Sequence, residues 1–351
     1  MTLTAPPVAE DAPPEGAARR RFIDKVFKAR ELAVAAVLVL MLLATQLSNT
    51  EFLSRQGVTD LLLNATILVL VATGQAVVVI TRNVDLSVGS VLGISAFAAG
   101  NHLQSGGSSL NAVVLAVGLG ALFGALNGAL VSLGKVPALV VTLGTLYIVR
   151  GIDSIWVGSR QITADSLPDG FVGFGHNGIW VVPYLALLAA AVVFCVGYYL
   201  RSYRSGREMY ALGSSPEAAQ LAGIPVRGRI MSAYVLCGAL AGLAGALYLA
   251  RFGNVDSATG SGYELTVVSA VVVGGVAFTG GSGTVYGAAL GALLLTSINS
   301  VLPAIGVSSV WVTAINGILL LLAIAVDRIL ALRVAAVLRK QAARMRSARH
   351  A

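Results

Sequence analysis

Two glycine-rich stretches of this sequence carry polar side chains in the middle of long apolar segments. The first is NVDLSVGSVLG at residues 83–93, after an uncharged run at residues 61–80, and the second is AFTGGSGTVYG at residues 277–287. Their carboxyl and hydroxyl groups belong to Asp85, Ser87, Thr279 and Ser282. Such groups either accept the unpaired N–H groups at a helix N-terminus or line a polar passage. For Asp85 and Ser87 both interpretations remain open.

The second stretch also has the form of a nucleophile motif. GGSG at residues 280–283 fits the G-x-S-G pattern of an intramembrane serine protease, whose serine needs a histidine base within hydrogen-bond reach. His102, His176 and His350 are expected at an outer span end, in an outer loop and in the C-terminal tail, whereas Ser282 is expected near the cytoplasmic surface. We predict no catalytic residue and no metal site in this chain.

The elements that must position these groups are membrane-spanning helices. Hydrophobic residues make up 56% of the 351 residues and charged residues only 11%, with a mean hydropathy of +0.83. Crossing the ~30 Å hydrocarbon layer takes about 20 apolar residues as helix. The sequence therefore predicts an all-α polytopic membrane protein with about ten transmembrane helices. The predicted spans are 32–47, 61–80, 86–103, 110–133, 137–157, 180–200, 230–250, 265–279, 285–302 and 310–326.

Basic residues predict the orientation of these spans. Most of the 24 Lys and Arg lie at residues 19–30, 201–229 and 328–349, which the positive-inside rule assigns to the cytoplasm. We expect a partly disordered cytoplasmic tail at residues 1–30, a transmembrane domain at residues 31–327 with a cytoplasmic loop at 201–229, and a basic cytoplasmic tail at 328–351. The net charge of +8 follows from this topology and indicates contact with anionic lipid rather than with nucleic acid.

The chain repeats itself. Residues 76–93 align with residues 270–287 at an offset of 194, and Asn127 and residues 141–142 recur as Asn299 and residues 312–313 at offsets of 172 and 171. We infer two related halves, spans two to five and seven to ten, as in many transporters. The polar residues inside spans could hydrogen-bond between helices or face a polar substrate, and both interpretations stay open. These residues are Asn64, Gln75, Asn127, Thr142, Asn299 and Asn316.

The cytoplasmic loop contains the pattern of a short helix. Ser215 is the expected N-cap, Pro216 the first helical residue, Glu217 part of the first turn and Gly223 the stop signal. A helix of about two turns is marginal in water. It therefore either docks on another protein or lies on the bilayer surface.

Five motifs in order along the chain carry a resemblance. They are NVDLSVGSVLG, LGTLYIVRGI at residues 143–152, GREMYALGSSPEAAQLAGI at 206–224, GSGYEL at 260–265, and VVVGGVAFTGGSGTVYGAALGA at 271–292. From about residue 30 to residue 327 the sequence resembles the membrane subunits of bacterial monosaccharide ABC importers, of the ribose, xylose, galactose, rhamnose and autoinducer-2 type. That family lies within the branched-chain amino acid permease superfamily.

The resemblance implies a multi-pass permease of the bacterial inner membrane that works with other chains. Its implied partners are a second permease copy or paralogue, two cytoplasmic ABC ATPase subunits and an extracytoplasmic sugar-binding protein. No cofactor is expected in this chain, and ATP and Mg belong to the ATPase. The absence of a G-x-x-x-x-G-K-[ST] phosphate loop agrees with this division.

The resemblance also implies roles for individual residues. The residues expected along the translocation path are Asn83, Asp85, Ser87, Gly89, Asn127, Thr142, Thr279, Ser282 and Asn299. The residues expected to couple the chain to the ATPase are Gly206, Arg207, Tyr210, Gly213, Ser215, Pro216, Glu217, Ala218, Ala219, Ala222, Gly223 and Ile224.

Two other transport functions remain as alternatives, a branched-chain amino acid ABC permease and an ion-coupled secondary transporter. The sequence departs from the sugar pattern at Asn83, where glycine is common, and at Thr266, where an acidic residue often stands. Secondary carriers keep ionisable residues deep in their spans, and here only Asp85, Arg150 and Asp153 come near such positions. Arg150 and Asp153 are three residues apart and are expected to pair near the outer surface.

Overall fold

The structure is a computed structural model that describes residues 15–308 and, beyond them, residues 311, 314–319, 321–322, 325 and 329. Side chains are described from residue 31 onward. The elements are α1 (Glu15–Ser48), α2 (Arg55–Ile80), α3 (Val88–Gln104), α4 (Ser109–Ser132), α5 (Ala138–Val157), η1 (Ala164–Ser166), α6 (Asp169–His176), β1 (Gly178–Ile179), β2 (Val182–Pro183), α7 (Tyr184–Ser202), α8 (Arg204–Ser214), α9 (Pro216–Leu221), α10 (Val226–Phe252), α11 (Tyr263–Val273) and α12 (Val285–Ala304).

The predicted all-α membrane fold is confirmed. Helices cover each of the first nine predicted spans, and the tenth, residues 310–326, lies partly outside the described residues. Seven helices of the described chain are long and apolar enough to cross a membrane. The predicted span 265–279 is wrong at its end, since α11 stops at Val273 and the chain turns at Gly274 and Gly275, the latter with φ of 95°.

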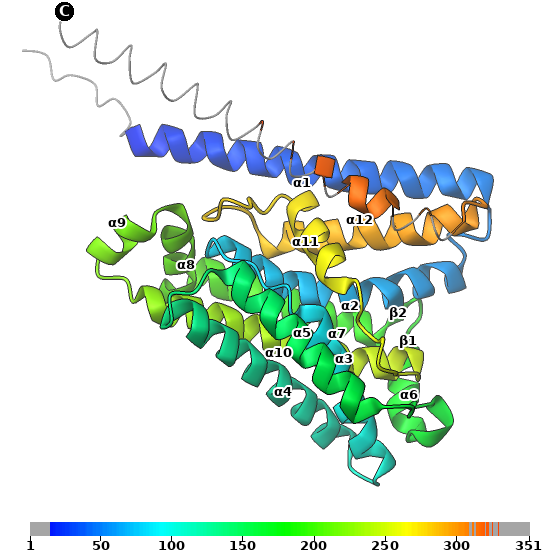
Figure 1. The fold of residues 1–351 in the computed structure, drawn as a ribbon. Helices are drawn as coiled ribbons and strands as arrows, with labels where there is room; N and C mark the ends of the chain where they lie inside the picture. The colour runs from blue at the N-terminus through cyan, green and yellow to red at the C-terminus, as the bar shows by residue number, and fades with distance from the viewer. Residues whose placement is uncertain are drawn as a thin grey trace, which may run out of the picture.

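The connections between helices gather at two ends of the bundle. Figure 1 shows α8 and α9 at one end and α6, β1 and β2 at the other, with the N-terminal end of α1 on the side of α8 and α9. The segment predicted to be cytoplasmic and the longest loop predicted to be outside therefore lie at opposite ends.

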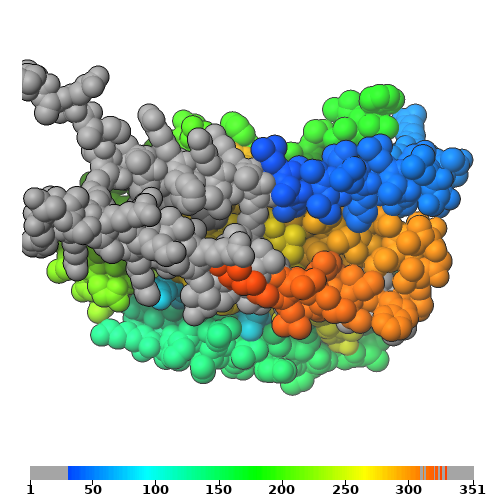
Figure 2. Space-filling view, turned by 90° about the horizontal axis from the view of Figure 1, so that it is seen from above, coloured from blue at the N-terminus to red at the C-terminus, as the bar shows by residue number. Residues whose placement is uncertain are grey.

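The helices differ strongly in burial. α2 runs through the core, with 94% of the residues in its apolar stretch buried. In α10 the buried share of the apolar stretch is 61%. α1 lies on the surface (Figure 2), where it packs against α12. Only 11% of the residues in its apolar stretch are buried. α1 also begins at Glu15, so the second half of the predicted N-terminal tail is helical.

The helix bounds show how the two halves correspond. A shift of about 172 residues carries α2 onto α10, α3 onto α11 and α4 onto α12, so the predicted halves are supported. The packing follows the same correspondence, because α10 packs on α4 as α2 packs on α12. The alignment at an offset of 194 is wrong, because it joins the α2–α3 junction to the α11–α12 junction. Segments rich in Val, Ala and Gly match by composition in more than one register.

Glycines allow the close and extensive contact between α4 and α10. A Cβ added at Gly120 would lie 2.8 Å from the Gly242 nitrogen, and one added at Gly238 would lie 2.9 Å from the Gly124 nitrogen. Small residues at this spacing bring two backbones together where side chains would hold them apart. This packing seats α10, and with it the polar segments that follow, against the first half.

Candidate functional site

The segment that joins α2 to α3 turns back into the helix bundle. α2 has 26 residues, about 39 Å of helix, whereas α3 has 17, about 25 Å. Gln75, five residues before the end of α2, lies beside Asp85, where its amide can donate to the Asp85 carbonyl at 3.1 Å and accept from the Asp85 N–H at 3.2 Å. Asp85 therefore lies beside α2, more than one helical turn before the C-terminal end of that helix.

A buried polar cluster surrounds the Asp85 carboxylate. Its Oδ1 accepts hydrogen bonds from the Ser87 backbone N–H at 2.9 Å and from the Ser87 hydroxyl at 2.6 Å. Asn127 Nδ2 on α4 donates to Ser87 Oγ at 2.9 Å and lies 3.5 Å from Asp85 Oδ1. All three side chains are at most 1% exposed. Hydrogen bonds of this kind make a buried carboxylate tolerable in an apolar core.

The Ser87 side chain does not cap α3, whereas the Asp85 carboxylate accepts a backbone N–H at the start of that helix. Ser87 does stand at the N-cap position of α3, but its side chain accepts no hydrogen bond from the first turn. Its hydroxyl donates to Asp85 instead, and Asp85 bonds the N–H of Ser87 itself, two residues on.

Two further helices, α5 and α10, hold the same segment. Tyr234 on α10 donates its hydroxyl to the Val84 carbonyl at 3.1 Å, and Thr142 on α5 lies 3.5 Å from that oxygen while donating to Ala138 at 2.9 Å. Asn83 is half-buried and bonds the Thr81 carbonyl at 2.9 Å. Polar groups from α2, α4, α5 and α10 thus converge on residues 83–87.

A second segment in the other half has a similar local geometry. Asp256 Oδ1 accepts from the Ala258 N–H, two residues on, at 2.9 Å, as Asp85 accepts from the Ser87 N–H, but its hydroxyl donor is Thr259 Oγ1, three residues on, at 3.1 Å. The tripeptide Asn-Val-Asp at residues 83–85 recurs at residues 254–256, and Gly89 and its following serine recur 171 residues later. This repeat was visible in the sequence but was missed, because the alignment at offset 194 passed over it.

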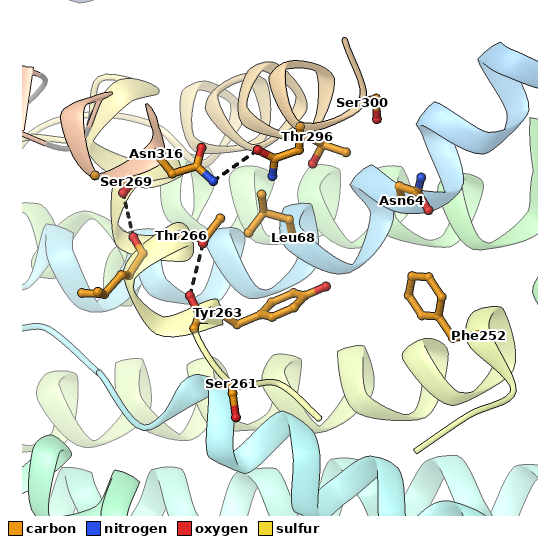
Figure 3. Close-up of a pocket in the computed structure, with 14 residues that line it drawn as sticks. Asn64, Leu68, Phe252, Ser261, Tyr263, Thr266, Ser269, Thr296, Ser300 and Asn316 are labelled. Atoms are coloured by element: carbon orange, nitrogen blue, oxygen red, sulfur yellow. Dashed lines mark hydrogen bonds between the residues drawn. The ribbon is translucent and has the colours of Figure 1, made fainter. Parts of the chain in front are cut away.

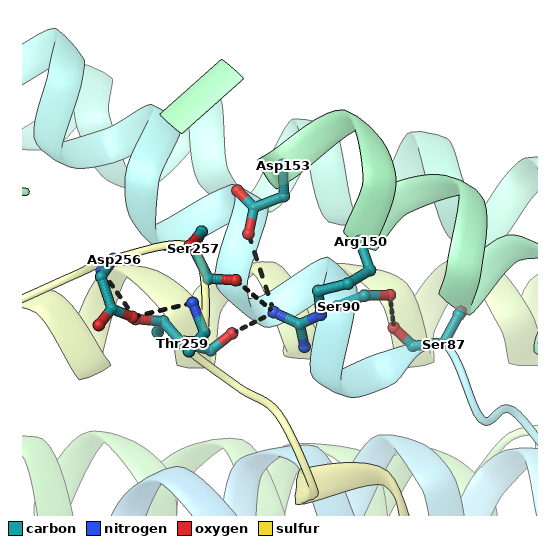
Figure 4. A network of polar contacts seen from close by, with 8 residues as sticks. Ser87, Ser90, Arg150, Asp153, Asp256, Ser257 and Thr259 are labelled. Atoms are coloured by element: carbon teal, nitrogen blue, oxygen red, sulfur yellow. Dashed lines mark hydrogen bonds and ion pairs between the residues drawn. The ribbon is translucent and has the colours of Figure 1, made fainter. Parts of the chain in front are cut away.

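Arg150 ties this second segment to α5. Its Nη1 donates to the carbonyl of Thr259 at 2.7 Å and of Ser257 at 3.3 Å (Figure 4). The predicted pairing with Asp153 is confirmed at 3.8 Å, and Asp153 is fully buried. Sequence reasoning did not find the two carbonyl contacts, since no side-chain pattern marks a carbonyl that accepts from a distant arginine.

The two repeated segments meet at their equivalent glycines. A Cβ added at Gly89 would lie 2.5 Å from the Gly260 carbonyl oxygen, and one added at Gly260 would collide with the Gly89 carbonyl. Gly260 also has φ of 78°, which a residue with a side chain rarely adopts. Gly89 is therefore a packing residue at the contact between the halves.

A pocket of about 610 Å³ lies beside this contact, between α2, α11, α12 and residues 316–317. Figure 3 shows the hydroxyls of Thr266, Ser269 and Ser300 and the amides of Asn64 and Asn316 around it. The residues that line the pocket in the described part of the chain include no charged side chain. The arrangement suits a small neutral ligand with several hydroxyl groups.

The predicted path residues fall into three places. Asn299 lines the pocket. Asn83, Asp85, Ser87, Gly89, Asn127 and Thr142 belong to the cluster or to the glycine contact, and they do not line the pocket. Thr279 and Ser282 lie in the loop between α11 and α12, which approaches α2 and α8, with Gly281 N–H bonding the Ile80 carbonyl at 2.9 Å.

The predicted short helix of the cytoplasmic loop is confirmed as α9. Ser215 Oγ accepts from the Ala218 N–H at 3.3 Å, Pro216 is the first helical residue, and Gly223 has φ of 75°. Leu221 is 91% exposed, and Glu217, Ala218 and Ala222 are also exposed, whereas Ala219 is buried.

The helix before it, α8, connects α9 to the bundle. Gly206 packs on the end of α7 and Gly213 packs against the Ile80 carbonyl and Gly281. The Tyr210 hydroxyl donates to the Gly283 carbonyl at 3.1 Å, and burial raises the pKa of Tyr210 to about 12, so the donor proton is kept at neutral pH. Arg207 bonds the Ser202 carbonyl at 2.8 Å, and Ile224 N–H bonds the Ala219 carbonyl at 3.0 Å.

Glu208 on α8 is a functional candidate that sequence reasoning missed. Its two carboxylate oxygens pair with Arg204 at 2.7 Å and with Arg229 of α10 at 2.8 Å. These hydrogen bonds hold the pKa of Glu208 below its usual value. The spacing Arg204–Glu208 was a readable signal for a pair on one helix face, but the contact with Arg229 depends on how α8 and α10 cross.

Comparison with known proteins agrees with this architecture. The family described as branched-chain amino acid transport system, permease component, matches residues 57–324. The chain is 37% identical over 303 residues to the autoinducer 2 import system permease protein of Enterobacter sp. (strain 638), covering 86% of this chain and 88% of that one. It is 33% identical over 310 residues to the ribose import permease protein of Escherichia coli (strain K12), covering 88% and 96%. No solved structure gave a significant match.

Proposed function

This chain belongs to the branched-chain amino acid transport system permease component family, and from that premise we propose that it is the membrane subunit of an ATP-driven importer for a monosaccharide or sugar-like molecule. Relatives that match over most of this chain are named import permeases for autoinducer 2 and ribose. In this proposal ATP and Mg bind to separate ATPase subunits, as the resemblance implies, and the sequence has no G-x-x-x-x-G-K-[ST] phosphate loop of its own.

The chemistry of the pocket is the observation that carries the sugar assignment. Its polar groups are hydroxyls and amides, which exchange neutral hydrogen bonds with sugar hydroxyls. A branched-chain amino acid would bring an ammonium and a carboxylate, and an unpaired charge is costly to bury. The described lining contains no charged partner for either group. This favours a sugar over an amino acid as substrate.

The pocket also lies where a delivered substrate would enter. It is lined by residues near the ends of α10 and α12 and the start of α11, which the predicted topology places toward the outside. An extracytoplasmic binding protein would therefore release its sugar close to this pocket. A second permease copy or paralogue completes the assembly, as the resemblance implies.

The segment α8–α9 is the coupling element of this proposal. α9 presents Leu221 and Glu217 without an intramolecular cover, as expected of a helix that docks in a groove of an ATPase. α8 touches both the end of α2 and the loop before α12 through Gly213 and Tyr210. A displacement of α9 would thus reach two helices that line the pocket.

An uptake experiment tests the function. Cells with and without the chain receive labelled ribose, xylose, galactose, rhamnose, autoinducer 2 or leucine, with ATP depleted or, separately, with the proton gradient collapsed. We expect uptake of one sugar or of autoinducer 2 to require the chain and ATP and to survive loss of the gradient. Uptake that follows the gradient, or uptake of leucine alone, would contradict the proposal.

A further inference from the structure

In each half of the chain a polar side chain donates a hydrogen bond to the amide oxygen of an asparagine, and the two pairs occupy corresponding positions. In the first half, Thr145 Oγ1 on α5 donates to Asn127 Oδ1 on α4 at 2.6 Å. In the second half, Asn316 Nδ2 donates to Asn299 Oδ1 on α12 at 3.2 Å (Figure 3). Asn299 and Asn316 lie 172 and 171 residues after Asn127 and Thr145. The two pairs are therefore structural equivalents, each orienting an asparagine amide.

The two asparagines differ in what their amide nitrogen meets. Asn127 Nδ2 donates to the Ser87 hydroxyl at 2.9 Å, with the Asp85 carboxylate at 3.5 Å. Asp256, the equivalent of Asp85, bonds only within its own segment and does not reach Asn299. Among the described residues, Asn299 Nδ2 has no hydrogen-bond partner, and the buried Asn316 Oδ1 has none either. The second half therefore lacks the oxygen that Ser87 supplies in the first.

In the second half, the side of Asn299 that corresponds to the Ser87 side of Asn127 faces the pocket. Asn299 lines it together with Thr296, one turn before it on α12, and Ser300, the next residue, and Asn64 lines it from α2. In the first half the equivalent amide is fully buried, since Asn127 has no exposed surface. The amide nitrogen of Asn127 is thus paired with Ser87, whereas the amide nitrogen of Asn299 is accessible to a ligand in the pocket.

Resting on the function proposed above, we propose that Asn299 binds a hydroxyl oxygen of the transported sugar through its Nδ2, in the role that the Ser87 hydroxyl fills at Asn127. Asn316 is a positioning residue that orients the Asn299 amide, as Thr145 orients Asn127. Asn127 itself is structural. The ligand class follows from the chemistry, because a neutral amide donor with hydroxyl neighbours matches a sugar hydroxyl better than a charged group.

Uptake of a sugar and of its monodeoxy analogues tests the proposed role of Asn299. Cells carrying the wild-type chain or Asn299→Ala receive labelled D-ribose, D-xylose and D-galactose, then the monodeoxy analogues of whichever sugar is accepted. Loss of one hydrogen bond predicts that Asn299→Ala lowers uptake of the parent sugar by about tenfold. Uptake of one monodeoxy analogue, which lacks the hydroxyl bound by Asn299, should be the same in both strains. Asn299→Leu, of similar volume, replaces Asn299→Ala if the latter fails to accumulate.

Matched variants separate binding from structure. Asn127→Ala should lower the melting temperature of the purified protein, whereas Asn299→Ala should leave it unchanged. Asn316→Ala should weaken uptake of the parent sugar, and Asn316→Thr should restore it, because threonine already performs this role at position 145.

The outcomes distinguish this inference from the function on which it rests. An equal loss for the parent sugar and all its analogues, or no loss at all, overturns the role of Asn299 while wild-type sugar transport stands. Absence of ATP-dependent sugar uptake in the wild-type strain would overturn the proposed function, and the role of Asn299 with it.

Discussion

Replacing Gly213 by alanine should disconnect α8 and α9 from the bundle. The added Cβ would collide with the Ile80 carbonyl oxygen and the Gly281 nitrogen and would lie 3.0 Å from the Gly281 Cα. All three are backbone atoms, and Gly281 N–H is itself bonded to the Ile80 carbonyl at 2.9 Å, so no side chain can move aside. Overpacking of this kind costs about 1–3 kcal/mol. The strain is relieved most easily by moving α8 away from α2.

The assay compares Gly213→Ala with the matched control Gly228→Ala. Gly228 lies in the first turn of α10, where an added Cβ meets nothing within 4 Å, so this variant should match the wild type. For Gly213→Ala we expect a melting temperature lower by about 2–4 °C for each kcal/mol lost, and ATP-dependent uptake reduced more than membrane abundance. Wild-type melting and wild-type uptake in Gly213→Ala would refute the reasoning.

Three further predictions concern the buried cluster and the coupling segment. Asp85→Ala removes the acceptor of two short hydrogen bonds and should destabilise the protein by about 2–3 kcal/mol in thermal unfolding, whereas an unchanged melting temperature would contradict its structural role. The pKa of Glu208 is lowered in the folded chain, so its ion pairs stabilise the fold above the unfolded pKa of about 4.5 and lose that effect as pH falls through the folded pKa. The difference in melting temperature between wild type and Glu208→Gln should therefore be constant near pH 7 and shrink below about pH 4.5. A difference that does not change with pH would count against this role of Glu208. Glu217→Arg and Leu221→Glu should reduce uptake and co-purification of the ATPase without changing membrane insertion, and normal uptake by both would remove α9 from the coupling site.

The sequence was sufficient for features that depend on neighbouring residues. Apolar runs located the first nine spans, because a lipid environment demands long helices with their hydrogen bonds satisfied internally. The signals Ser215, Pro216 and Gly223 located α9 for the same local reason, since caps and stops act within one turn. The pairing of Arg150 with Asp153 needed only helical spacing.

Features that join distant residues could not be predicted in the same way. The partners of the Asp85 carboxylate depend on the path of residues 83–87 and on Asn127, which is 42 positions away. The correct register of the repeat was legible in the two Asn-Val-Asp tripeptides, but a match of Val, Ala and Gly hid it. Helix bounds decided between the two registers.

Hydropathy, charge and capping act locally, so they were enough to identify an all-α membrane protein with two related halves and a short helix, α9, between α7 and α10. The tertiary structure was needed to show that Asn127 donates to Ser87, whereas its equivalent Asn299 faces a pocket. The two asparagines occupy equivalent positions, and the difference in their partners depends on segments far from them in the sequence. Their difference arises from where the segments of residues 83–87 and 254–260 lie once α2 and α10 have packed, and packing is a property of the whole fold.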